Sequence, residues 1–135
     1  MSFEESIKLG YAKEIKPNKN RAQALHLSSK EALKTALEIE LKNHTSKTIL
    51  RELYESLREL CEAIGYKKGY KFSSHESITH FLISFLNQKN QGIKFDRYRK
   101  LRNDINYYGK QINKETVIKA RIEIPEIYKE LESEL

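Results

Sequence analysis

Apolar residues recur at three- and four-residue steps along most of the chain, with polar residues between them. The pattern is most regular at residues 46–68, where leucine and isoleucine occupy Leu50, Leu53, Leu57, Leu60 and Ile64. This heptad-like spacing predicts a long helix that packs antiparallel on a neighbouring helix. The same seam is also suited to pairing with a second copy of the chain.

Similar spacing predicts helices before and after this segment. The expected helical ranges are about 20–42, 73–88, 95–110 and 113–134, and a weaker pattern at 2–15 indicates a short helix or an arm. No strand-like alternation competes with the helical pattern. We therefore expect an all-α fold, an up-down antiparallel bundle of five to six helices. Residues 1–16 form its N-terminal arm or short helix, and residues 17–135 form the bundle domain.

Three local signals modify the predicted helices. Ser28 with Glu31 has capping-box spacing, which predicts a kink or a fresh start within the first long helix. Ser73 with Glu76 has the same spacing and predicts the start of a later helix. Pro125 is expected to kink or interrupt the last helix, because proline cannot donate the backbone hydrogen bond.

The composition fits a single domain that is held together by packing. The chain has 135 residues and one cysteine, Cys61, which cannot form an internal disulfide and is expected to be a buried structural thiol. This cysteine usage fits a reducing compartment, so we expect a cytoplasmic location. The first residues lack the basic and apolar regions of a signal peptide, and the apolar runs are too short to predict a membrane span.

Positive charge is concentrated in one third of the sequence. The chain carries a formal net charge of +6, and residues 66–110 contain ten Lys/Arg against three Asp/Glu. Five of the eight tyrosines lie in the same segment. Basic groups interleaved with aromatic rings suit a surface that binds phosphates and stacks on bases. The alternative is a solvated basic surface with tyrosines in the core.

The predicted helix at residues 95–110 contains the candidate site. Helical spacing places one set of side chains on its apolar face, namely Tyr98, Leu101, Ile105 and Tyr108. The opposite face carries Arg99, Asn103, Asn106, Tyr107 and Lys110. Arg102 falls at the border, and Gly109 predicts the C-terminal end of the helix. Arg102 can bind a phosphate through its planar fork, or it can make a structural salt bridge to a glutamate on another helix.

Two stretches resemble HEPN domains (higher eukaryotes and prokaryotes nucleotide-binding), a family of small helical bundles. The first is FDRYRKL followed by RNDINYYG, and the second is LYESLRELCEAIGYKKGYK followed by SHES. The resemblance is closest to uncharacterised, archaeal-type prokaryotic members and covers the chain from about residue 20 to its end. It implies a homodimer, because many members are metal-independent endoribonucleases whose composite site forms where two copies meet.

The sequence departs from the family motif at one catalytic position. Members carry an Arg, often followed by a polar residue, and then a His after four to six residues. Arg102 and Asn103 match the first two positions, but the positions for the His hold Tyr107, Tyr108 and Gly109. A phenol with a pKa of about 10 is ionised in about one molecule per thousand at neutral pH, a penalty of about 4 kcal/mol for acting as a base. We therefore expect nuclease activity to be weak or lost.

The resulting prediction is an RNA- or nucleotide-binding HEPN-like homodimer without a metal or another cofactor. The residues expected in any catalysis are Arg102, Asn103 and Tyr107. The residues expected to bind nucleic acid are Arg99, Arg102, Asn106, Tyr108, Lys110, Lys67 and Lys68. The histidines give no alternative centre, and His75, near the start of its helix, is expected to be a surface residue.

Two other functions stay open at this point. One is an active, toxin-like endoribonuclease that a nucleotidyltransferase partner regulates, since HEPN proteins are often encoded beside such partners. The other is a non-enzymatic dimeric helical scaffold, supported by the leucine seam and by the glutamate-rich tail from Glu123.

Overall fold

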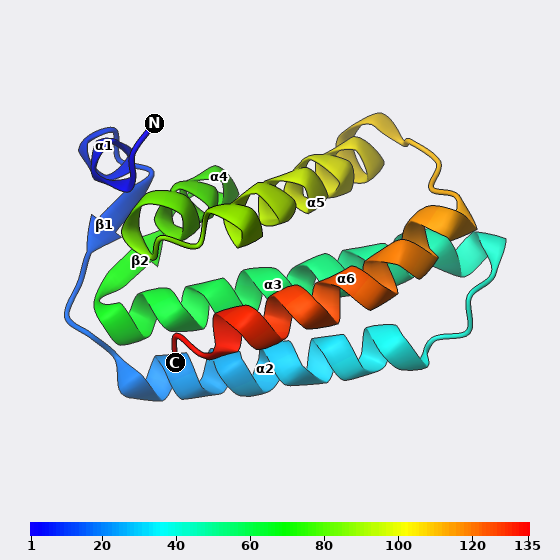
Figure 1. The fold of residues 1–135 in the computed structure, drawn as a ribbon, viewed down its shortest axis with the longest axis horizontal. Coiled ribbons are helices and arrows are strands. Elements are labelled where there is room, and N and C mark those ends of the chain that lie inside the picture. The colour runs from blue at the N-terminus through cyan, green and yellow to red at the C-terminus, as the bar shows by residue number, and fades with distance from the viewer.

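Four long helices run alternately up and down and form a bundle, as the sequence predicts (Figure 1). The structure is a computed structural model that describes residues 1–135. The long helices are α2 (Lys19–Glu38), α3 (Ser46–Lys68), α5 (Lys89–Tyr108) and α6 (Lys114–Glu132). The smaller elements are α1 (Phe3–Lys8), β1 (Ala12–Glu14), the 3₁₀ turn η1 (Asn43–Thr45), β2 (Tyr70–Phe72), α4 (His75–His80) and the π-helical segment η2 (Phe81–Phe85). With six α-helices, the predicted all-α bundle is confirmed.

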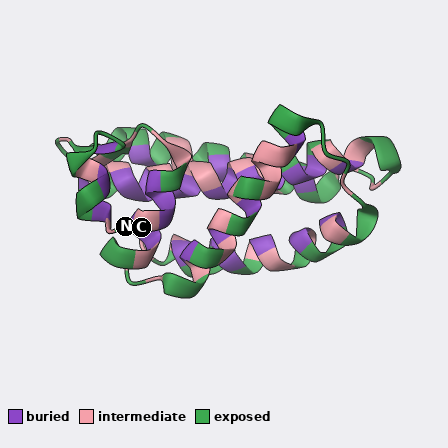
Figure 2. Cartoon of the chain, turned by 90° about the horizontal axis from the view of Figure 1, so that it is seen from above, coloured by how far each residue is buried: buried purple, intermediate pink, exposed green.

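Helix α3 is the centre of the core. Its leucine seam is completely buried, and the helix contacts α2, α5 and α6. Figure 2 shows buried residues along the inward faces of the helices and exposed residues on their outer faces. Burying each Leu or Ile side chain stabilises the fold by about 1.5–3 kcal/mol. Because the seam is used within the chain, it does not form a surface for a second copy.

The N-terminal segment is joined to the bundle by a small sheet that the sequence did not predict. Strands β1 and β2 pair antiparallel, with Ala12 opposite Phe72 and Glu14 opposite Tyr70. Each strand has three residues, which is too short to give a recognisable alternation. Phe3 of α1 also enters the core, with its ring 5.0 Å from that of Phe81. The segment predicted as an arm or short helix therefore contains both a helix and a strand.

Several helix ends differ from the predicted ones. Helix α5 begins at Lys89, six residues before the predicted start, because the polar segment around Gly92 is helical and packs against η2. Helix α4 is capped by Ser74 and not by Ser73, since the Ser74 hydroxyl accepts a hydrogen bond from the Ser77 amide (3.1 Å). The predicted end at Gly109 is confirmed, with φ +62° in the left-handed region.

Two predicted disturbances do not interrupt their helices. Helix α2 is continuous past Ser28, so the predicted fresh start there is wrong. Helix α6 continues through Pro125, with Ile124 and Ile127 buried on either side of it. Packing of these apolar side chains offsets the loss of one backbone hydrogen bond. No helix combines the length and the apolar composition that a membrane-spanning segment needs.

Candidate functional site

Two contacts between α3 and α5 place two arginine side chains next to each other. Arg51 donates a hydrogen bond from Nε to Asn106 Oδ1 (2.8 Å), and the Arg102 guanidinium lies over the Tyr54 ring, 5.8 Å from its centroid. Arg51 and Tyr54 are three residues apart on α3, and Arg102 and Asn106 are four apart on α5. Each pair is therefore separated by about one helical turn, or about 5 Å along the axis. Arg51 and Arg102 therefore lie about one helical turn apart on the two facing helices.

Arg102, like Arg51, has no carboxylate partner, unlike Arg58 and Arg99. It makes no ion pair, and its one hydrogen bond is a long contact to Asn103 Oδ1 (3.5 Å). By contrast, Arg58 bonds Glu55 and Glu62, and Arg99 bonds Asp96. The predicted alternative, a salt bridge from Arg102 to a glutamate, is wrong. Arg102 is half-buried, as its border position on the helix predicts, and its positive charge is uncompensated.

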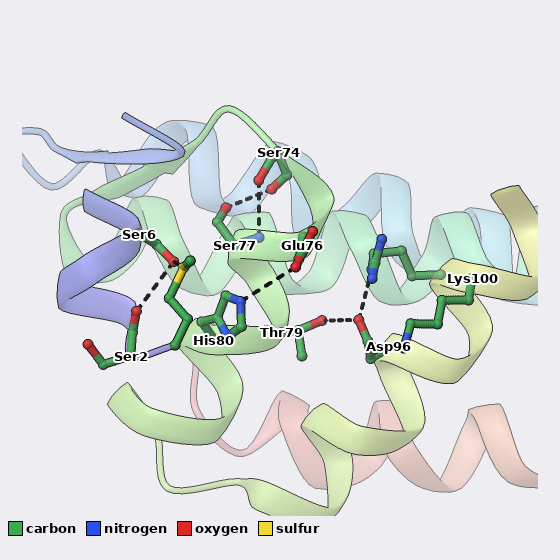
Figure 3. Close-up of polar contacts among 11 residues, drawn as sticks. Ser2, Ser6, Ser74, Glu76, Ser77, Thr79, His80, Asp96 and Lys100 are labelled. Carbon is green, nitrogen blue, oxygen red and sulfur yellow. Dashed lines mark hydrogen bonds and ion pairs between the residues drawn. The ribbon is translucent and has the colours of Figure 1, made fainter. Parts of the chain in front are cut away.

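Asp96 pairs with Arg99 and Lys100, the last two basic side chains before Arg102 on α5. It accepts hydrogen bonds from Thr79 Oγ1 (3.0 Å) and Arg99 Nε (2.8 Å), and its other oxygen lies 3.1 Å from Lys100 Nζ. Figure 3 shows Asp96 joined to Thr79 of α4 with Lys100 beside it. Burial raises the pKa of Asp96, but the hydrogen bonds from Arg99 and Lys100 outweigh burial and leave the pKa below its usual range. Arg99 therefore has less free charge for a ligand than Arg102.

A histidine from α4 also belongs to the site, although no pattern in the sequence indicates it. His75 Nδ1 lies 3.0 Å from the Tyr54 hydroxyl, and the two ring centroids are 5.9 Å apart. Burial, followed by the nearby Arg58 and Arg102 guanidinium groups, lowers the pKa of His75 to about 4. The imidazole is therefore neutral at neutral pH. The expectation that His75 is a surface residue is only partly correct, because the side chain is half-buried against α3.

Tyr54 holds both Arg102 and His75. Its ring is completely buried under the Arg102 guanidinium, and its hydroxyl reaches His75. Burial raises the pKa of Tyr54, and Arg102 opposes that effect only in part. The phenol therefore keeps its proton, and Tyr54 acts as an uncharged support for the two side chains. We call Arg51, Tyr54, His75, Arg102 and Asn106 the Arg102 cluster.

The end of α5 exposes two aromatic side chains close to this cluster in sequence. Tyr107 is 72% exposed and Tyr108 is 81% exposed. The prediction that Tyr108 lies on the apolar face with Ile105 is therefore wrong, because the core packing of α5 ends at Ile105. Lys110, beyond the end of the helix, lies 3.7 Å from the Asp104 carboxylate.

Two of the expected binding residues lie elsewhere. Lys67 and Lys68 are at the C-terminal end of α3, about 25 Å from Arg51 at 1.5 Å of rise per residue. Lys68 makes an ion pair with Glu134 (3.8 Å), and Lys67 lines a separate pocket with Lys19 and His26. The basic third of the sequence therefore does not fold into one continuous patch.

The sequence carried part of the signal for this site. The mixed polar face of residues 95–110 identifies Arg102 and Asn106, but Arg51 and His75 come from other elements and lack a local pattern. Comparison of the chain with protein families, with characterised proteins and with solved structures gives no match. The function is therefore inferred from the geometry of the Arg102 cluster.

Proposed function

We propose that this chain is a HEPN-like RNA-binding protein that contacts a backbone phosphate through Arg102. The observation that carries the proposal is the uncompensated guanidinium of Arg102, fixed over the buried Tyr54 ring. A guanidinium that is already oriented loses little conformational freedom when it forms two hydrogen bonds to phosphate oxygens. Arg51, one turn away, supplies a second cation.

The exposed aromatic rings at the end of α5 favour a single-stranded nucleic acid over a free phosphate. Tyr107 and Tyr108 are largely solvent-exposed, so their ring faces are available to unpaired bases. Stacking of a base on an aromatic side chain contributes about 1–3 kcal/mol and is tolerant of sequence. Contact of a phosphate with Arg102 and stacking of bases on Tyr107 and Tyr108 would use both the basic and the aromatic side chains of this part of α5.

The proposal is tested by measuring RNA affinity at several salt concentrations for two variants of α5. Arg102→Ala removes the uncompensated guanidinium and is expected to weaken binding of an unstructured RNA by about 1–3 kcal/mol. Loss of one phosphate contact also makes the slope of log K against log salt shallower by about 0.7 for a single strand.

Arg97→Ala is the matched control. It removes the same charge from the same helix, but Arg97 is paired with Glu123. Its effect on affinity is expected to be small, and its salt slope should equal that of the wild type. Equal affinities for the wild type and Arg102→Ala at low salt would contradict the proposal and leave a helical scaffold as the better interpretation.

One observation favours a second function, metal-independent cleavage of RNA. His75 is a neutral imidazole in the Arg102 cluster, and such a group can accept the proton of a 2′-hydroxyl, but its lowered pKa makes it a weak base. The binding samples, incubated in EDTA, would then yield fragments with 2′,3′-cyclic phosphate ends. Homodimerisation and regulation by a nucleotidyltransferase partner belong to this proposal as consequences of the resemblance. Binding is preferred because it requires only the observed arrangement of Arg102.

A further inference from the structure

We propose that His75 is a direct ligand of the bound phosphate and takes up one proton when the phosphate binds at Arg102. This inference rests on the proposed function, because it concerns the same cluster. It adds a binding residue that the α5 helix does not supply, and it specifies the chemistry of the ligand as an anion whose affinity increases when the imidazole is charged.

The two nitrogens of His75 have different surroundings. Nδ1 lies 3.0 Å from the Tyr54 hydroxyl, which fixes the ring plane. Nε2 has no hydrogen-bond partner within the chain. The side-chain atoms that are fully buried without a partner are Glu59 Oε2, Gln91 Oε1 and Arg121 Nε, so Nε2 of His75 is not fully buried. Nε2 therefore reaches solvent, and it is free to donate a hydrogen bond to an incoming oxygen.

The groups around His75 oppose its protonation while no anion is bound. Arg58 of α3 and Arg99 and Arg102 of α5 all disfavour a fourth positive group at His75, and Glu55 of α3 favours it. Burial acts in the same direction as the arginines and is the largest effect. Glu76, the next residue on α4, pairs with His80 (3.9 Å). The empty site therefore contains a neutral imidazole among guanidinium groups.

A phosphate oxygen at Arg102 reverses this balance. It adds negative charge among the guanidinium groups and gives Nε2–H an acceptor, and both effects favour the imidazolium. In the charged ring both nitrogens donate, Nδ1–H to the Tyr54 oxygen and Nε2–H to the phosphate, whichever neutral tautomer was present before binding. The additional proton comes from solvent. Tyr54 can accept this hydrogen bond because a hydroxyl is both a donor and an acceptor.

The consequence is that affinity increases as the pH falls. The pKa of His75 is about 4 without the anion and is expected to rise by about two units in the complex. By linkage, affinity is then nearly constant above the pKa of the complex and increases about tenfold between about pH 8 and about pH 5.

The experiment measures the anisotropy of a rhodamine-labelled oligouridylate at constant ionic strength from about pH 8 to about pH 5. Uracil and the phosphodiester do not titrate in this range, so the RNA itself contributes no proton. The wild type is expected to bind about tenfold more tightly at the acidic end. His75→Gln, which cannot become charged, is expected to lose this increase, so that its affinities at about pH 5 and about pH 8 are nearly equal.

His80→Gln is the matched control, since His80 is on the same helix and pairs with Glu76 outside the cluster. It is expected to keep the full increase in affinity at low pH. A second readout on the wild-type protein is the NMR titration of the His75 ring, whose pKa should rise from about 4 by about two units when the oligouridylate is added.

Two negative results separate this inference from the proposed function. If Arg102-dependent binding is present at about pH 8 but His75→Gln leaves the pH dependence unchanged, this inference is overturned and the proposed function stands. If no Arg102-dependent binding occurs at any pH, both are overturned.

Discussion

Tyr54 shows how one buried side chain can determine the chemistry of two others. Its ring supports the Arg102 guanidinium, and its hydroxyl orients His75. Burial keeps the phenol protonated and the imidazole neutral, so the two groups are uncharged while Arg102 carries a positive charge. The polar periodicity of α5 was sufficient to place Arg102 at the border between the polar and apolar faces of the helix. It could not predict His75, because that side chain becomes part of the cluster through contact with a residue 21 positions earlier in the sequence.

The neutral state of His75 predicts an acid-dependent loss of stability. Its pKa is lowered from 6.5 to about 4 in the folded chain, so the unfolded chain binds more protons between these two values. The free energy of unfolding therefore decreases as the pH falls from 6.5 towards 4. Because the side chain is only half-buried, we expect this group to contribute about 1–2 kcal/mol of that loss.

Denaturant unfolding of the wild type and His75→Gln at neutral pH and near pH 4 measures this contribution. The variant should lose less stability on acidification than the wild type. Equal losses in the two proteins would show that His75 titrates normally in the folded state.

Helix α3 was the easiest element to predict, and the junction between η2 and α5 was the hardest. The leucine seam has a strong repeat because all its members face one core. The start of α5 has a polar, glycine-containing sequence that is typical of a turn, and its helical structure depends on packing against η2. Strands β1 and β2 were missed because three-residue strands are specified by pairing with each other and not by an internal pattern.

Gly92 is expected to be required where α5 crosses η2. A methyl group at this position would collide with Cγ1 of Ile83 and would lie 3.3 Å from Leu82 Cβ. Alanine normally stabilises a helix interior by about 1 kcal/mol relative to glycine. Here the overlap should dominate, and Gly92→Ala should lower the free energy of unfolding by about 1–3 kcal/mol.

Asn90→Ala is the control for this substitution, because Asn90 is exposed in the same turn of α5. It is expected to be neutral or slightly stabilising in thermal unfolding. A Gly92→Ala protein as stable as the control would show that η2 and α5 are packed less closely than described.

At the scale of the whole molecule, the basic residues predicted to bind nucleic acid lie in two separate places on the bundle. The Arg102 cluster lies between α3 and α5, and Lys67 and Lys68 lie at the other end of α3, beside the C-terminal residues. The sequence predicted the bundle. The clustering of basic residues in residues 66–110 suggested one continuous basic surface, which the fold does not form. The helix directions explain this distribution. Because α3 runs antiparallel to α5, the C-terminal end of α3, with Lys67 and Lys68, lies far from the C-terminal end of α5 (Figure 1).

NMR titration of the isotope-labelled protein with unlabelled oligouridylate tests the central claim most directly, because it locates the bound RNA. Binding at the Arg102 cluster predicts that the Arg102 and Arg51 side-chain Nε–H signals and the His75 ring signals shift together, while the amides of Lys67 and Lys68 do not. Shifts confined to Lys67, Lys68 and the adjacent Lys19, with Arg102 unaffected, would contradict the account and place the basic function at the other end of the bundle.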